Sequence, residues 1–198
     1  VCSSDLALDF WLARLDAQGV KHQGREFFAG REMIRFTDLE GQRLALVDDG
    51  GAAYAGEIWA GTDIPPEFAL RGFYAVMLSV SQLSFVEPIL TRLLEFKATG
   101  RAPYPDGREV IIFAMDEGGP GRELWVMEEP AAPIARLGAG GVHHVAFRVS
   151  DQEEQRYWHQ RISSVRLPVS DFIDRYYFRS IYFRISNGIL FEIATDGP

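Results

Sequence analysis

Apolar and polar residues follow one another along this chain in two patterns, one typical of helices and one of short strands. Apolar residues at helical spacing predict helices at 5–17, 82–94 and 150–163. Gly19 is expected to end the first helix as its C-cap, and Ser150 and Glu153 have the spacing of a capping box at the start of the third. Alternating runs between turn residues predict strands at 32–36, 43–48, 71–80, 109–115, 122–127, 142–149, 177–184 and 188–194.

The predicted elements form an internal repeat. A strand, a helix and two or three further strands occur in this order twice, and a third copy lacks its first strand. Residues 71–80 align without gaps to residues 140–149, and residues 36–47 align to residues 183–194. Repetition of this kind indicates a fold assembled from one supersecondary unit. The sequence therefore predicts an α+β fold of repeated βαβββ units, with the N-terminal unit missing or incomplete, rather than a doubly wound sheet.

The start of the chain is unusual, because it lacks an initiator methionine and Val1–Leu6 resemble a translated sequencing adapter. We therefore expect the chain to be a fragment of a longer protein. A stretch rich in Gly, Ala and Pro follows the incomplete unit and predicts a linker. The predicted organisation is a partial βαβββ unit at 1–48, which is the second unit of an N-terminal domain, a linker at 49–69, and a C-terminal domain at 70–198 with units at 70–130 and 140–196.

Composition and charge narrow the class of protein. The 198 residues include 20 Lys and Arg against 28 Asp and Glu, a net charge of −8, and 47% of them are apolar, as in globular proteins. The acidic balance argues against nucleic acid as a partner, because phosphate binding needs clustered cations. No apolar run approaches the roughly 20 residues of a membrane-spanning helix. The single cysteine, Cys2, fits a reducing compartment, so we expect a soluble, cytoplasmic protein.

Two residues break the similarity between the repeats in a way that suggests chemistry. His144 occupies the position of Ala75 in the other complete unit, and Glu192 occupies the position of Ala45 in the incomplete one. Both lie in strands expected to be buried, where a carboxylate needs a cation, a hydrogen-bond donor or a metal. A lone His in a strand is usually a packed core residue, and a lone Glu can simply pair with an Arg. As matched exceptions in a repeat, the two together favour a metal site.

One His and one carboxylate are two parts of the 2-His-1-carboxylate set that holds Fe(II) with open positions. His143 and His144 are consecutive on a predicted strand, so we expect their side chains on opposite faces and only one of them beside Glu192. His22 and His159 fit surface or packing positions better than that of a ligand. The residues alone leave the third ligand unidentified, and the missing first strand is where we expect it.

Three stretches near the C-terminus together resemble one enzyme family. They are Gly138–Val149, Asp174–Arg184 and Gly188–Pro198, and the earlier units match more loosely. The family is that of hydroquinone-type ring-cleaving, extradiol dioxygenases in the vicinal oxygen chelate superfamily, related to glyoxalases. The resemblance implies four βαβββ units, of which this chain holds the incomplete second, the third and the fourth, with a metal site between the first and fourth. It implies Fe(II) or Mn(II) held by His144, Glu192 and a His of the first unit.

The resemblance also implies roles for three further residues. Tyr182 is expected to lie at the metal and contact substrate or oxygen, Arg175 to stabilise negative charge on the reacting ring, and His143 to bind substrate or relay protons. From the residues alone, Arg175 better fits a surface ion pair with a neighbouring aspartate, and Tyr182 better fits strand packing. Tyr176 departs from the polar residue usual in the family, which affects the expected shape of the pocket.

The sequence thus predicts an Fe(II)-dependent, extradiol-type ring-cleaving dioxygenase that acts on hydroquinone-like aromatic diols with O₂, as a homo-oligomer in its full-length form. Two other functions stay open on the same fold. A glyoxalase-like lyase or isomerase would also use a His and a Glu on a divalent metal but would not consume oxygen. A metal-free binding module of the bleomycin-resistance kind would sequester a ligand. As a dioxygenase, a chain without its first unit would be inactive alone, because one metal ligand would be missing.

Overall fold

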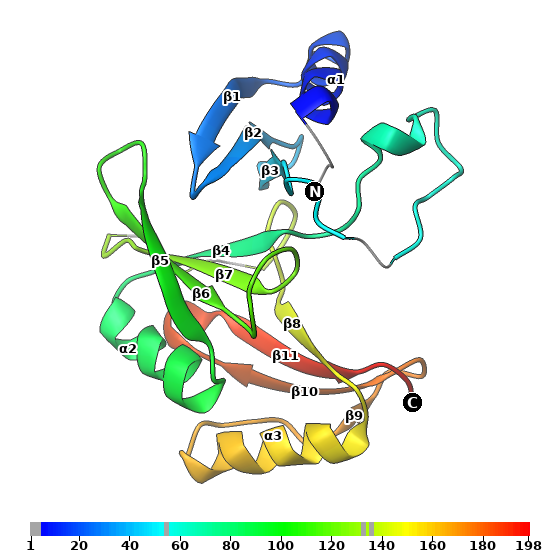
Figure 1. The fold of residues 1–198 in the computed structure, drawn as a ribbon. Helices are drawn as coiled ribbons and strands as arrows, with labels where there is room; N and C mark the ends of the chain where they lie inside the picture. Colours follow the sequence, from blue (N-terminus) through cyan, green and yellow to red (C-terminus); the bar gives the residue numbers. More distant parts are fainter. Residues whose placement is uncertain (1–4, 54–55, 132–133, 135–136) are drawn as a thin grey trace. The chain divides into compact units, whose positions relative to one another are not determined.

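The computed structural model describes residues 5–53, 56–131, 134 and 137–198 (Figure 1). The chain divides into two compact units, Val1–Ser79 with Phe96–Glu128, and Val80–Glu95 with Glu129–Pro198. Short strands alternate with single helices along the sequence, which confirms the predicted α+β class. The predicted domain boundaries divide the chain differently and stay a prediction. Among the described helices, none is both long and apolar enough to cross a membrane.

The first unit contains helix α1, Asp5–Ala17, and two sheets. One sheet is antiparallel with the order β1–β2–β3. Its strands are β1 (His22–Phe28), β2 (Arg31–Thr37) and β3 (Arg43–Val47). The other sheet has the order β4–β7–β6–β5. Its strands are β4 (Ala75–Val80), β7 (Glu123–Glu128), β6 (Glu109–Ala114) and β5 (Lys97–Pro103). A 3-10 turn, η1, Pro66–Phe68, lies within the predicted linker.

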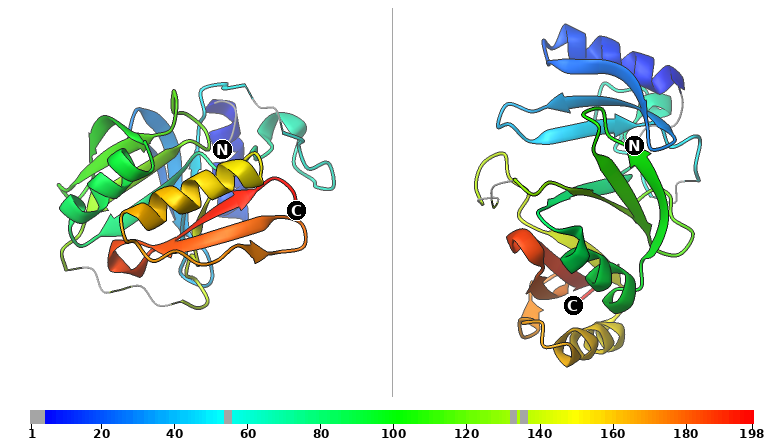
Figure 2. Two further views of the ribbon diagram at one scale, coloured as in Figure 1. Left: turned by 90° about the horizontal axis from the view of Figure 1, so that it is seen from below. Right: turned by 90° about the vertical axis from the view of Figure 1, so that its left-hand side faces the viewer.

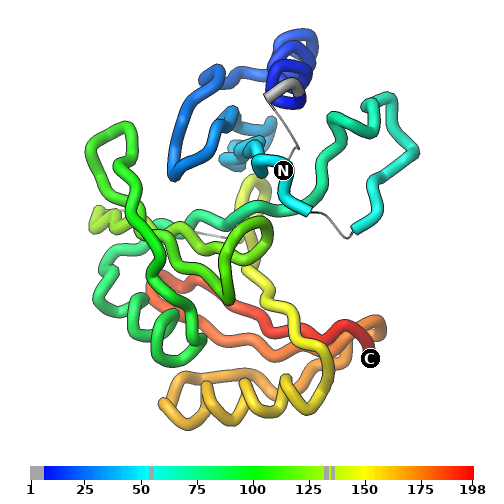
Figure 3. Tube along the Cα trace, in the orientation of Figure 1, coloured from blue at the N-terminus to red at the C-terminus, as the bar shows by residue number. Residues whose placement is uncertain are grey.

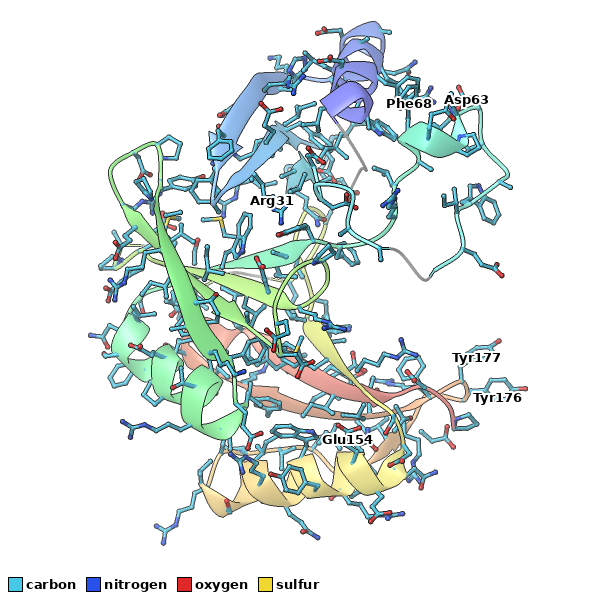
Figure 4. The ribbon with its side chains drawn as sticks, viewed as in Figure 1. Arg31, Asp63, Phe68, Glu154, Tyr176 and Tyr177 are labelled. Atoms are coloured by element: carbon cyan, nitrogen blue, oxygen red, sulfur yellow. The ribbon has the colours of Figure 1, made fainter. Side chains whose placement is uncertain are left out.

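Helix α1 has the predicted bounds, and Gly19, at φ +67°, follows its last turn as expected for a C-cap. Its apolar face is buried, since Leu8 is inaccessible to solvent and packs in a cluster with residues of β2 and β3. Trp11 adds a polar contact, because its indole Nε1 donates to the backbone oxygen of Phe68 at 2.8 Å. Helix α1 therefore holds η1 in place within the first unit (Figure 4).

An aromatic cluster joins the two sheets of the first unit. The rings of Phe28 in β1 and Trp125 in β7 meet edge to face with their centroids 5.5 Å apart, and the ring of Tyr74 lies 6.0 Å from that of Trp125. Arg31 donates from Nε to the Tyr74 hydroxyl at 3.1 Å. Burial raises the pKa of the Tyr74 phenol above its ordinary value, so this side chain stays neutral across the physiological range.

The second unit contains a four-stranded sheet with helices. Helix α2, Leu83–Pro88, continues into a π-helical turn, η2, Ile89–Leu93, and helix α3 spans Gln152–Ser164. The sheet has the order β8–β11–β10–β9. Its strands are β8 (Val145–Val149), β11 (Leu190–Thr195), β10 (Arg179–Arg184) and β9 (Ile173–Asp174). A 3-10 turn, η3, Ser186–Gly188, connects β10 to β11. Strand β8 pairs parallel to β11, although the two are far apart in sequence (Figure 3).

Helix α3 lies along one face of this sheet (Figure 2). Gln155 fixes the helix there, since its side chain is fully buried and its Nε2 donates to the backbone oxygens of Arg179 and Ile193 at 2.8 and 2.9 Å. Arg161 contacts the other helical segment, because its Nε donates to the oxygen of Leu93 at 2.7 Å. These bonds satisfy carbonyl groups at a helix end and within the strands, so α3 both covers the sheet and pins η2.

The structure corrects two predictions about the helices. Asp151, and not Ser150, caps α3, because the Asp151 carboxylate accepts from the backbone N–H groups of Glu153 and Glu154. These bonds lower the pKa of Asp151, and the predicted capping box of Ser150 and Glu153 does not form, since Glu154 accepts from the N–H and the hydroxyl of Ser150. The helix predicted at 82–94 changes from α to π winding after Pro88, which has no N–H to donate to the preceding turn.

Three strands were not predicted, and four of the predicted strands, β4, β8, β10 and β11, begin two or more residues later than expected. Strands β1, β5 and β9 carry many polar or small residues, so their sequences lack a strong apolar alternation. These strands form because neighbouring strands pair with them through backbone hydrogen bonds. Strand β5, for example, pairs along its length with β6. Strands β4 and β8 begin at Ala75 and Val145, since the glycine-containing segments before them do not join a sheet.

Candidate metal centre

Glu192 lies in the middle of β11, between two neighbouring strands. The register places it opposite Tyr182 of β10 on one side and Ala146 of β8 on the other. Its side chain is almost completely buried, with 3% of the residue exposed. A carboxylate in this position needs compensating donors or a cation, because the sheet excludes water from it.

Three side chains surround the Glu192 carboxylate. Tyr182 donates its hydroxyl to Oε1 at 2.7 Å, and the hydroxyl of Ser180, two residues earlier on the same face of β10, donates to the same oxygen. His144 approaches from before β8, and its Nε2 lies 2.7 Å from Oε2. The two carboxylate oxygens therefore have different surroundings: two hydroxyl groups meet at Oε1, and an imidazole nitrogen meets Oε2.

The two consecutive histidines do not point to opposite faces, so that part of the prediction was wrong, but only His144 contacts Glu192 directly, as expected. The Nδ1 atoms of His143 and His144 are 2.9 Å apart, so one ring donates to the other, and the ring planes are nearly perpendicular. The reason is that β8 begins only at Val145, so strand alternation does not govern the residues before it. His143 consequently reaches Glu192 through His144.

Arg175 joins the same group through Tyr182. Its Nη2 donates to the Tyr182 hydroxyl at 3.2 Å, and its guanidinium carbon lies 5.3 Å from the centre of the Tyr182 ring. Within the described part of the chain, Arg175 forms no ion pair with Asp171 or Asp174, which had been the simpler expectation. The Asp174 carboxylate instead accepts from the backbone N–H of Tyr176 at 2.7 Å. Positive charge is thus directed at the Tyr182 hydroxyl.

The turn after Arg175 carries an exposed aromatic pair. Tyr176 and Tyr177 are 79% and 75% exposed, and both project from the turn (Figure 4). Tyr176 has φ +73°, a conformation that is costly for a residue with a large side chain. The bond from the Arg175 N–H to the oxygen of Phe178 closes this turn at 2.9 Å. The turn geometry therefore fixes where the Arg175 side chain begins.

The five predicted site residues, His143, His144, Arg175, Tyr182 and Glu192, thus come together in one connected group. Ser180 also belongs to it, and the sequence analysis missed this residue. A signal was present, since Ser180 and Tyr182 are two residues apart and therefore share a face of the predicted strand. A serine in a strand is common, however, and only the register with β11 shows that its hydroxyl meets Glu192.

The donor atoms of His144 and Glu192 fit a shared metal ion. Metal–nitrogen and metal–oxygen bonds of roughly 2.0–2.2 Å at right angles place two donor atoms about 3 Å apart, close to the observed 2.7 Å. Among the described residues, no group of three or more His, Cys, Asp and Glu side chains could hold a metal. His22 pairs with Asp16, and His159 faces the oxygen of Ser170 and the ring of Phe172. His144 and Glu192 are therefore the two candidate ligands in the part of the chain that the structure describes.

Comparison with known proteins gives the group a context. No protein-family model matches the chain. The chain is 42% identical over 193 residues to "Putative ring-cleaving dioxygenase MhqA" of Bacillus subtilis, with 97% of this chain and 61% of that protein covered. It is 31% identical over 144 residues to a chlorohydroquinone/hydroquinone 1,2-dioxygenase of Sphingobium indicum, with 70% of this chain and 43% of that protein covered. The chain thus spans less than two thirds of the length of these relatives.

Solved structures agree with the sequence relatives. A crystal structure described as that of a "putative dioxygenase from Bacillus subtilis" superposes with a TM-score of 0.82 at 30% identity, covering 97% of this chain and 59% of that one. A glyoxylase/bleomycin resistance protein/dioxygenase domain from Frankia shares the fold, with a TM-score of 0.55 at 18% identity, covering 65% of this chain and 93% of that one. The predicted fold of βαβββ units is thereby confirmed. The chain thus has the vicinal oxygen chelate fold and is similar over most of its length to proteins named ring-cleaving dioxygenases.

Proposed function

We propose that this chain provides two ligands and the substrate-side residues of a metal-dependent dioxygenase that cleaves hydroquinone-like aromatic diols with O₂. The observation that carries the proposal is the buried Glu192 carboxylate, whose Oε2 lies 2.7 Å from Nε2 of His144. Relatives named as ring-cleaving dioxygenases, one of them for hydroquinone and chlorohydroquinone, support the class of reaction. Extradiol-type cleavage is part of the proposal.

The proposed metal is Fe(II) or Mn(II), held by His144, Glu192 and a His of a further βαβββ unit. A His and a carboxylate are two members of the set that binds Fe(II) and leaves positions open. When bound, such a metal would bring a substrate phenolate and O₂ together. The chain's own contribution is to hold its two donor atoms in place and to manage charge and protons beside them.

His143 is placed to handle a proton. When Nε2 of His144 binds a metal, the hydrogen of that ring is on Nδ1, and Nδ1 of His143 is the acceptor 2.9 Å away. A neutral His143 then carries its own hydrogen on Nε2, the atom on the far side of the ring. His143 can therefore donate this hydrogen to a substrate oxygen and act there as a general acid.

Tyr182 and Arg175 are placed to stabilise negative charge. The Tyr182 hydroxyl donates to Glu192 and accepts from Arg175, so its hydrogen bonds are oriented on both sides. Arg175 remains charged at any pH relevant to the enzyme. A phenolate or a ring-opened anion beside Tyr182 would therefore meet a fixed positive charge, which is the arrangement that lowers the energy of a charged transition state.

Fe(II) binding is tested by anaerobic titration of this chain. Oxygen uptake is tested by oxygen-electrode assays, with methyl- or chlorohydroquinone and with catechol, of the chain completed by the unit that carries the third proposed ligand. We expect Fe(II) binding, and oxygen uptake that requires both Fe(II) and the hydroquinone. Metal-dependent turnover of a hemithioacetal without oxygen uptake would favour a glyoxalase-like lyase. Tight binding of an aromatic ligand with no metal bound would favour a binding module. The same assay with Mn(II) in place of Fe(II) identifies the metal that supports oxygen uptake.

The two histidines are expected to respond differently to substitution. His144→Gln removes a proposed ligand, so we expect the Fe(II) dissociation constant to rise by more than about 100-fold, beyond the effect typical of a residue that only contacts a ligand. His143→Gln should change Fe(II) affinity by roughly 10-fold or less and lower turnover instead, by about 10²–10⁴-fold if it transfers a proton. Equal Fe(II) affinity in the wild type and His144→Gln would contradict the ligand assignment.

A further inference from the structure

Ser180 has no counterpart among the residues expected from the sequence, and its hydroxyl is completely buried against Glu192. We propose that Ser180 is a positioning residue: it holds Oε1 of Glu192 so that only Oε2 is presented to the metal. The inference rests on the proposed function, because it concerns the way in which one of the two proposed ligands is held. It predicts single-oxygen ligation by Glu192.

The backbone around Ser180 is held on both sides. Ser180 pairs with Ala194 of β11 and with Ile173 of β9, so its Cα lies between two strands. Ser180 is fully buried, with 0% of the residue exposed, so the surrounding protein atoms restrict rotation of its side chain. A short side chain on a backbone fixed in this way places its hydroxyl accurately, because only one dihedral angle has to be ordered.

The two donors to Oε1 differ in a way that assigns the anchoring role to Ser180. Tyr182 is partly exposed, and its hydroxyl has a second partner in Arg175. Its bond to Glu192 can therefore be exchanged for one to a substrate. Among the contacts of the described residues, the Ser180 hydroxyl faces Glu192 alone. Ser180 is the donor that stays with Oε1 when substrate engages Tyr182.

The two bonds to Oε1 restrict the carboxylate as a whole. An oxygen of a carboxylate has two lone pairs, and the hydroxyls of Ser180 and Tyr182 occupy both. Rotation that turned Oε1 toward His144 would break both bonds in a buried site, where unmade hydrogen bonds are costly. Glu192 is therefore held with Oε2 toward Nε2 of His144. Removal of the Ser180 hydroxyl frees this rotation while Tyr182 is engaged elsewhere.

The test is a Mn(II) titration of the chain, followed by electron paramagnetic resonance, on the wild type, Ser180→Ala and Thr195→Val. Thr195 is a matched control, because it is a buried hydroxyl residue on β11 that bonds the N–H of Arg179 and does not contact Glu192. We expect Ser180→Ala to raise the Mn(II) dissociation constant by about 10- to 100-fold, the range for partners that orient a ligand. Thr195→Val should bind as the wild type does.

A second variant guards against a loss of folding in Ser180→Ala. Ser180→Cys has nearly the same shape and a weak donor, so it should fold normally and still lose about 10-fold in Mn(II) affinity. Co(II) absorption spectra give an independent readout, and we expect the coordination bands of Co(II) to differ between Ser180→Ala and the wild type. Mn(II) affinities of both Ser180 variants within 2-fold of wild type, or an equal loss in Thr195→Val, would overturn the role of Ser180. A wild-type chain that binds neither metal would overturn the proposed function and this inference with it.

Discussion

Glu192→Gln is expected to abolish binding of Fe(II) and Mn(II) while the second unit keeps its fold. Glutamine has the same shape, so its oxygen can still accept from Ser180 and Tyr182, and its amide can donate to Nε2 of His144. The anionic donor is lost, however, and with it one of the two proposed ligands. We expect the dissociation constant of either metal to rise by more than about 100-fold, which isothermal titration under anaerobic conditions measures.

Stability separates a loss of the ligand from a loss of the fold. An amide of the same shape removes the cost of burying a charge and still accepts from Ser180 and Tyr182, so the melting temperature of metal-free Glu192→Gln should equal or exceed that of the wild type. The wild type, unlike Glu192→Gln, should melt higher when Fe(II) is added, because a metal that binds only the native state stabilises it. Glu153→Gln, which removes an exposed carboxylate on α3, is the control and should retain this shift. A shift in Glu192→Gln equal to that of wild type would contradict the assignment.

Phe191→Ala is expected to destabilise the second unit by about 3–5 kcal/mol, the range for a buried aromatic residue. Phe191 is completely buried beside Glu192 in the sequence, and by strand alternation its side chain lies on the opposite face of β11. Its ring meets those of Phe147 and Phe183, with centroids 5.0 and 5.7 Å away. Truncation would leave a cavity between β8, β10 and β11. Urea denaturation followed by circular dichroism measures the change in the free energy of unfolding.

The expected loss is a large part of the stability of a typical domain, which is roughly 5–15 kcal/mol. A matched control is Phe85→Ala on α2, since Phe85 belongs to the same unit and is 62% exposed. Its effect should stay within about 0.5 kcal/mol. If Phe191→Ala also changed the free energy of unfolding by less than 1 kcal/mol, roughly the lower limit for a core truncation, the packing of this face would differ from that described. Metal binding by folded Phe191→Ala should be retained, because Glu192 lies on the other face.

The repeat in the sequence anticipated more of the site than any single motif did. His144 and Glu192 stood out because each replaced an alanine at the equivalent position of another unit, and the structure places Nε2 of one 2.7 Å from Oε2 of the other. Equivalent positions in a repeat share a place in the fold. A polar residue at such a place is therefore exceptional in three dimensions as well.

The expectation that His143 and His144 face opposite sides of a strand was wrong for a reason that is not in the local sequence. Val142 to Val149 alternate well enough to indicate one strand, and alternation would separate the two histidines. Strand β8 begins only at Val145, where β11 begins to pair with it through Phe191. The start of a strand depends on its neighbour, and β11 lies more than forty residues further along the chain.

The sequence by itself determined the α+β class, the βαβββ repeat, the bounds of α1 and the pair of residues proposed to bind the metal. These features are expressed in local periodicity and in the comparison of one segment with another. Only the tertiary structure decided that the two histidines meet, that Arg175 is directed at Tyr182 and that Ser180 holds Glu192. Side-chain hydrogen bonds at such a site depend on strand register and on where each strand begins. Those depend on pairing between segments distant in sequence, which no local pattern records.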